Sequence, residues 1–152
     1  METNYELLNE QLRNIIDGVD DFVSNLSNAS ALLFQEIVDI SWAGFYLAKN
    51  NALYLGPFQG KIACSKIEFG KGLCGTAYET KETVIVKNVH EFKGHIACDS
   101  RSNSEIVVPI FFKDEIIGVL DIDSISFNRF SENDKTGLEE FCKILGDSYK
   151  WK

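Results

Sequence analysis

Three cysteines in the middle of the chain are the residues best suited to redox chemistry. Cys64 stands in GKIACSKIEFG, Cys74 in GKGLCGTA and Cys98 in GHIACDSRSNSE. The segment around Cys98 is polar and lacks helix or strand periodicity, and long loops in compact domains are typically functional or disordered. His95, three residues earlier, could assist ionisation of the Cys98 thiol, and the thiolate is the reactive form of cysteine. Cys98 is therefore the cysteine whose context is least like a protein core.

The other cysteines have structural explanations. Cys142 lies on the apolar stripe of the last predicted helix, which predicts a buried, inert thiol. Cys74 is expected near a helix N-terminus, where the dipole stabilises a thiolate, but apolar packing explains it equally well. Zinc ligands usually lie two to four residues apart in pairs. Because Cys64 and Cys74 are ten residues apart, and Cys74 and Cys98 twenty-four, we predict no metal site.

A second candidate group is acidic. Asp121 and Asp123 in GVLDIDS are two residues apart and share one strand face, roughly 6.6 Å apart along the strand. In a small pocket, each carboxylate would raise the pKa of the other and leave one group able to donate a proton at neutral pH. The alternative interpretation is a strand end that simply faces solvent.

Glu105 could join the two aspartates from the neighbouring predicted strand, depending on the pairing register. A strict two-residue turn at residues 113–114 would place Glu105 opposite Ile122, and so away from the aspartate face. A longer turn, or a β-bulge at Pro109, would turn Glu105 towards the aspartates. The sequence pattern leaves both registers open.

Hydrophobic periodicity predicts the elements that position these residues. Helices are expected over 5–16, 21–38, part of 70–82, and after Ser131, an N-cap with Asp134 three positions on. Strands are expected on either side of a turn at residues 50–51 in segment 41–60, and in TVIVKNV, EIVVPIFF and IIGVLDIDS. Trp42 and Tyr46 share one face of the first strand. Strands bracketed by helices predict a single α+β domain over residues 1–152, with helices packed on one antiparallel sheet.

Composition argues against several classes of function. The chain of 152 residues has a net charge of −8, which disfavours binding to nucleic acid and to anionic membrane surfaces. No apolar run approaches the roughly 18 residues that a transmembrane helix needs, and the first twenty residues lack the pattern of a signal peptide. We therefore expect a cytoplasmic protein with reduced thiols, in which any disulfide is transient and catalytic.

Five motifs occur in order along the chain: WAGFY, LGPFQGKIAC, GKGLCGTA, HIACDSRSNSEIVVPIF and IIGVLDIDS. At these spacings they resemble the free methionine-(R)-sulfoxide reductases, a family built on the GAF domain. The resemblance covers about residues 42–134 and implies a GAF-like antiparallel sheet flanked by helices. Ile62 stands where the family more often has proline, a departure that could alter how the Cys64 loop moves.

The resemblance also implies a redox mechanism that needs no cofactor. Cys98 would attack the sulfur of free L-methionine (R)-sulfoxide, release methionine and become a sulfenic acid. Cys64 would then condense with Cys98 to form a disulfide that thioredoxin reduces, and Cys74 would be an auxiliary thiol for recycling. A non-catalytic GAF sensor, in which Cys98 reports oxidation, is the alternative.

The resemblance implies a substrate pocket as well. Glu105, Asp121 and Asp123 would surround the substrate, bind its ammonium group and handle the sulfoxide. Trp42 and Tyr46 would line the pocket for the methyl and methylene groups. The implied partners are the free amino-acid substrate and thioredoxin. The sequence leaves the choice between a monomer and a homodimer open.

Overall fold

The structure is a computed structural model that describes residues 2–94 and 101–149, so His95 and Cys98 lie outside the described residues. The elements follow in the order α1 (Tyr5–Ile16), α2 (Phe22–Glu36), β1 (Trp42–Lys49), β2 (Ala52–Gln59), β3 (Lys66–Glu68), α3 (Gly72–Thr80), β4 (Val84–Val86), the 3₁₀ helix η1 (Val89–Glu91), β5 (Ser104–Phe112), β6 (Glu115–Ser124) and α4 (Glu132–Asp147). Every predicted helix and strand is present. The sequence does not predict β3 and η1, because three residues are too few to show a periodicity and neither segment is a β-branched run like the one that reveals β4.

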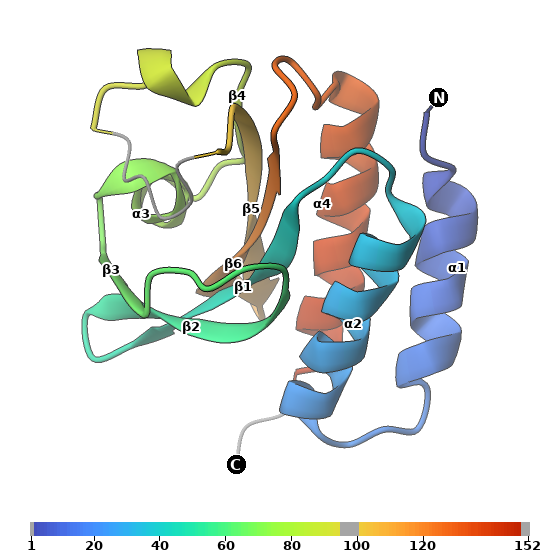
Figure 1. Cartoon of the computed structure of the whole chain (residues 1–152). Helices are drawn as coiled ribbons and strands as arrows, with labels where there is room; N and C mark the ends of the chain where they lie inside the picture. Colours follow the sequence, from blue (N-terminus) through green and yellow to red (C-terminus); the bar gives the residue numbers. More distant parts are fainter. Residues whose placement is uncertain (1, 95–100, 150–152) are drawn as a thin grey trace.

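The six strands form one antiparallel sheet in the order β3-β2-β1-β6-β5-β4. Helices α1, α2 and α4 cover one face of the sheet, and α3 lies on the other (Figure 1). The first face holds the larger apolar core, which includes the fully buried Leu33, Phe45 and Phe141. The α3 face holds a smaller cluster that includes Trp42 and Tyr46. The predicted α+β architecture is confirmed.

Helices α1, α2 and α4 begin after residues whose side chains cap them, namely Asn4, Asp21 and Ser131. Ser131 accepts from the backbone of Asp134, whose side chain accepts from the backbone of Ser131, so the predicted capping box is present. Tyr5 also donates a hydrogen bond to Asp134 (2.5 Å), which ties α1 to α4. In the described part of the chain, no helix combines the length and the apolar character needed to cross a membrane.

The β5–β6 hairpin settles the register that the sequence left open. Lys113 and Asp114 form a two-residue turn with φ of 50° and 67°, the left-handed conformation of a type I′ turn. The pairing then shifts between Ile110 and Phe111, where β6 contributes one extra residue. As a result Glu105 lies opposite Asp123 rather than Ile122. The turn is the strict one, and the bulge is on β6 at Ile117, whereas Pro109 of β5 pairs regularly with Val119.

Candidate active site

A cluster of carboxyl groups lies on the α3 face of the sheet, on the neighbouring strands β5 and β6. Asp123 pairs with Trp42 of β1 on one side and with Glu105 of β5 on the other. Asp121 pairs in the next row with Gly44 of β1 and with a valine of β5. Glu105, Asp121 and Asp123 are only 7%, 6% and 8% exposed. The three carboxyl groups are therefore buried together, and the interpretation of a strand end in solvent is wrong.

Burial of these groups changes their protonation. Burial and the charges of Asp121 and Asp123 raise the pKa of Glu105 well above the usual value. Burial also raises the pKa of Asp121, although hydrogen bonds from neighbouring side chains oppose this effect. Glu105 consequently holds its proton at pH values where an exposed glutamate is ionised. A buried acid of this kind can donate a proton near neutral pH.

The raised pKa of Glu105 predicts how stability depends on pH. The folded state binds this proton more tightly than the unfolded state, so the proton contributes to the free energy of unfolding. This contribution is complete below about pH 4.5 and is lost as the pH rises through the folded-state pKa of Glu105. Glu105→Gln should therefore gain stability relative to the native chain as the pH rises from 5 to 8, by at most about 1.4 kcal/mol per pH unit. Urea denaturation of the reduced proteins at several pH values measures this difference.

Glu115→Gln is the matched control, because Glu115 begins β6 and its side chain is exposed. Its stability difference should stay constant over the same pH range. A constant difference for Glu105→Gln would contradict the buried, protonated state of this carboxyl.

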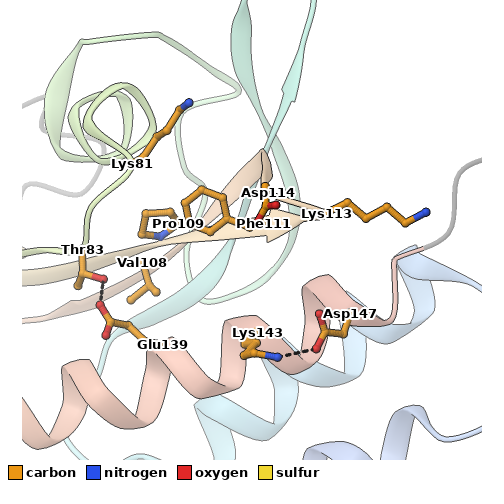
Figure 2. Close-up of a pocket in the computed structure, with 10 residues that line it drawn as sticks. All are labelled: Lys81, Thr83, Val108, Pro109, Phe111, Lys113, Asp114, Glu139, Lys143 and Asp147. Carbon is orange, nitrogen blue, oxygen red and sulfur yellow. Dashed lines mark hydrogen bonds and ion pairs between the residues drawn. The ribbon is translucent and has the colours of Figure 1, made fainter.

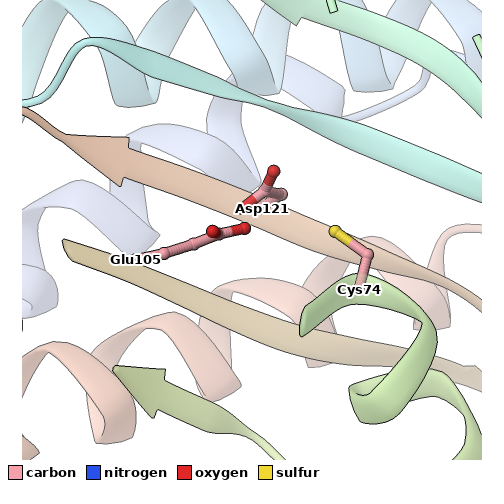
Figure 3. Close-up of side chains that lie close together, drawn as sticks. All are labelled: Cys74, Glu105 and Asp121. Carbon is pink, nitrogen blue, oxygen red and sulfur yellow. The ribbon is translucent and has the colours of Figure 1, made fainter. Parts of the chain in front are cut away.

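Cys74 faces the same cluster from α3, as Figure 3 shows. It is the third residue of that helix and is 4% exposed. Burial, and next the negative charges of Asp121, Glu105 and Asp123, raise the pKa of its thiol well above the usual value. These effects outweigh the helix dipole, so of the two interpretations of Cys74 the structure favours the packed thiol over the stabilised thiolate.

Trp42 and Tyr46 border the cluster and also hold the loop that carries Cys64. Trp42 Nε1 donates to the carbonyl oxygen of Lys61 (3.0 Å), and Tyr46 Oη donates to the carbonyl oxygen of Cys64 (2.9 Å). The two rings are stacked with their centroids 6.0 Å apart. Gly44 stands between them on this face, where a Cβ atom would come within 2.7 Å of the Trp42 ring. The sequence pattern predicted the shared face but not the hydrogen bonds to the Cys64 loop.

The cysteines differ in state within the described residues. Cys64 is half-buried and disulfide-bonded. Cys74 and Cys142 are free and buried. The prediction that Cys142 is a buried thiol is confirmed, and burial raises its pKa.

Asn103 anchors the chain just after the segment that contains Cys98. Its backbone N–H donates to the carbonyl oxygen of Ser124 (2.8 Å), and its carbonyl oxygen accepts from Val89 (2.9 Å). Its side-chain Oδ1 also contacts His90 Nε2 (2.9 Å). Because Ser124 directly follows Asp123, these bonds fix the returning chain beside the carboxyl cluster.

A separate cavity of about 500 Å³ opens beside the β5–β6 hairpin (Figure 2). It is lined by Lys81, Thr83, Val108, Pro109, Phe111, Lys113, Asp114, Glu139, Lys143 and Asp147. Two interactions join residues of its wall: Thr83 donates to Glu139 (2.6 Å) and Lys143 pairs with Asp147 (3.0 Å). No residue of the predicted site lines this cavity, so we assign it no part in the chemistry.

Known proteins resemble this chain both in sequence and in fold. A family model described as a GAF domain matches residues 11–147. A free methionine-R-sulfoxide reductase of Escherichia coli (strain K12) is 51% identical over 141 residues, which cover 93% of this chain and 86% of that protein. The chain belongs to the GAF-domain family of free methionine-R-sulfoxide reductases.

Solved structures of this family match the chain over nearly its whole length. The reduced form of fRMsr of Staphylococcus aureus is 52% identical with a TM-score of 0.94, and the match covers 97% of this chain and 96% of that one. A free methionine-R-sulfoxide reductase from Neisseria meningitidis, in complex with its substrate, is 42% identical with a TM-score of 0.92, covering 95% of this chain and 87% of that one. The expected GAF-like fold is thus confirmed.

Proposed function

We propose that this protein reduces free L-methionine (R)-sulfoxide to methionine, with the buried carboxyl cluster as its substrate pocket. The observation that carries this proposal is the buried cluster of Glu105, Asp121 and Asp123 on one sheet face, beside Trp42 and Tyr46. Membership of the reductase family supports the reaction, and the Neisseria meningitidis relative is solved in complex with its substrate.

The carboxyl cluster has the chemistry to recognise a free amino acid. Buried carboxylates are costly unless a cation compensates them, and the α-ammonium group of a free amino acid supplies that charge. A methionine sulfoxide within a peptide lacks this group, so its binding would leave the charges uncompensated. Asp121 Oδ1 is buried and has no hydrogen-bond partner among the described residues, which leaves it available to a substrate N–H or O–H.

Glu105 is the group best suited to activate the sulfoxide. Its raised pKa favours the protonated form, and a proton given to the sulfoxide oxygen makes the sulfur electrophilic. The Cys98 thiolate then attacks this sulfur, the sulfur–oxygen bond breaks, and the oxygen ends on Cys98 as a sulfenic acid while methionine leaves. Two electrons pass from the cysteine sulfur to the sulfoxide in this step.

Cys64 completes the proposed cycle. Its thiol condenses with the sulfenic acid, which releases water and forms a disulfide, and thioredoxin in the cytoplasm reduces that disulfide by thiol exchange. Cys64 is disulfide-bonded while Cys74 and Cys142 are free, which favours Cys98 as its partner. Burial of the Cys74 thiol is consistent with an auxiliary rather than a first role.

Tyr46→Phe should slow closure of this disulfide. The change removes the hydrogen bond from Tyr46 to the Cys64 carbonyl, which fixes the loop, and one hydrogen bond is worth about 0.5–1.5 kcal/mol, or roughly two- to tenfold in rate. The Cys98 sulfenic acid should then persist and be trapped by dimedone in quenched samples. Tyr54→Phe, on β2, is the matched control and should close the disulfide at the native rate. Equal closure rates in both variants would exclude the loop-holding role.

Peptide mapping after oxidation by substrate tests the pairing itself. With no reductant present, we expect a Cys64–Cys98 disulfide and one methionine for each oxidised pair. A Cys74–Cys98 disulfide with Cys64 still free would instead make Cys74 the resolving thiol.

A further inference from the structure

The carboxyl cluster and Cys74 together have the composition of a metal site. One ligand atom each from Cys74, Glu105 and Asp121 lies within 4.8 Å of the others (Figure 3). A point therefore exists within about 2.8 Å of all three atoms, so small side-chain rotations would bring them to the roughly 2.0–2.3 Å of zinc–oxygen and zinc–sulfur bonds. Spacing in the sequence hides this set, because Cys74 is far from both carboxyl groups along the chain.

A second observation points to a missing ligand. Asp121 is 6% exposed, yet its Oδ1 atom has no hydrogen-bond partner within residues 2–94 and 101–149. The Asp121 carboxyl interacts with the Cys74 thiol and the Glu105 carboxyl, but these hydrogen bonds do not satisfy its Oδ1 atom. A buried acceptor atom of this kind costs free energy until a cation or a further donor arrives.

We propose that Cys74, Glu105 and Asp121 form a binding site for a thiophilic divalent cation such as Zn²⁺, and that the cation and the substrate exclude each other. The sulfur ligand selects a borderline-soft ion, whereas Ca²⁺ and Mg²⁺ need more oxygen ligands than the three residues provide. Three protein ligands leave a fourth position open on a tetrahedral ion. Cation binding does not depend on the proposed function. Only the competition between cation and substrate rests on that function.

Co²⁺ is a suitable probe, because a cobalt–thiolate bond gives a charge-transfer absorption band in the near ultraviolet. The full-length Cys64→Ser/Cys98→Ser protein lacks the proposed redox thiols and therefore cannot reduce the sulfoxide. We expect one Co²⁺ per chain, a thiolate band, and its displacement by Zn²⁺ but not by a hundredfold excess of Mg²⁺. Adding Cys74→Ala should abolish the band, whereas adding Cys142→Ala should retain it.

Glu105→Gln and Asp121→Asn, in the same background, keep the thiol and should each weaken Co²⁺ binding at least tenfold. The absence of a thiolate band, its persistence in the Cys74→Ala protein, or native affinity in both amide variants would overturn the site. Free methionine sulfoxide should displace Co²⁺ as its concentration rises. A band that the sulfoxide cannot displace would confirm the cation site and contradict the proposed substrate pocket instead.

Discussion

Cys98→Ser is expected to release no methionine from free methionine (R)-sulfoxide, even within a single turnover. Serine is nearly isosteric, but it is not ionised at neutral pH and lacks the affinity of a thiolate for an electrophilic sulfur. The loss should therefore reach the detection limit and should not depend on the reductant. Quantifying methionine after mixing excess reduced protein with substrate isolates this step from recycling.

Two variants serve as controls for this loss. Cys142→Ala removes a buried thiol from the opposite face of the sheet and should keep full activity, with at most a modest cost in stability. Cys64→Ser should still release one methionine per chain, because attack precedes resolution, but its thioredoxin-driven turnover should slow or stop. Native single-turnover yield from Cys98→Ser would remove this cysteine from its proposed role.

Glu105→Gln and Asp123→Asn should each lower turnover of free methionine sulfoxide at least tenfold. Each change keeps the size of the side chain but removes its charge and its transferable proton, and general acid–base groups typically contribute about 10²–10⁴ in rate. For Glu105→Gln the fall should appear in kcat, because the proton donor acts in the transition state. For Asp123→Asn it should appear mainly in KM if this carboxylate binds the ammonium group.

Exposed acids on the same hairpin provide matched controls. Glu115→Gln and Asp114→Asn repeat the two substitutions at the far end of the β5–β6 hairpin, and asparagine tolerates the left-handed φ of 67° at position 114. Both should turn over normally. Normal turnover by the Glu105 and Asp123 variants would reduce the cluster to a structural feature.

Features set by residues that are close together along the chain can be predicted from the sequence, whereas the strand register cannot. The sequence predicts the Ser131 cap, the turn at residues 50–51 and the common face of Trp42 and Tyr46, because these follow from local propensity and a period of two. The position of Glu105 depends on a single bulge between Ile110 and Phe111, and no local signal distinguishes the two registers.

Contacts between residues that are far apart along the chain cannot be predicted from local sequence patterns. Cys74 lies close to Asp121 only because α3 packs over β6. The two residues are far apart in the sequence, so no local pattern predicts their contact. The protonation of the cluster follows from the same packing, since burial rather than residue type sets it. The hydrogen bond from Tyr46 to the Cys64 carbonyl is a further contact of this kind.

The most direct test of the proposed function uses the two separated epimers of free methionine sulfoxide. The full-length protein, incubated with each epimer and dithiothreitol, should convert the R epimer to methionine over many turnovers and leave the S epimer largely unchanged. N-acetylated R sulfoxide, which lacks the ammonium group, should react at least tenfold more slowly. No methionine from the free R epimer would contradict the reductase function, and would leave the carboxyl cluster as the ligand pocket of a non-catalytic GAF module.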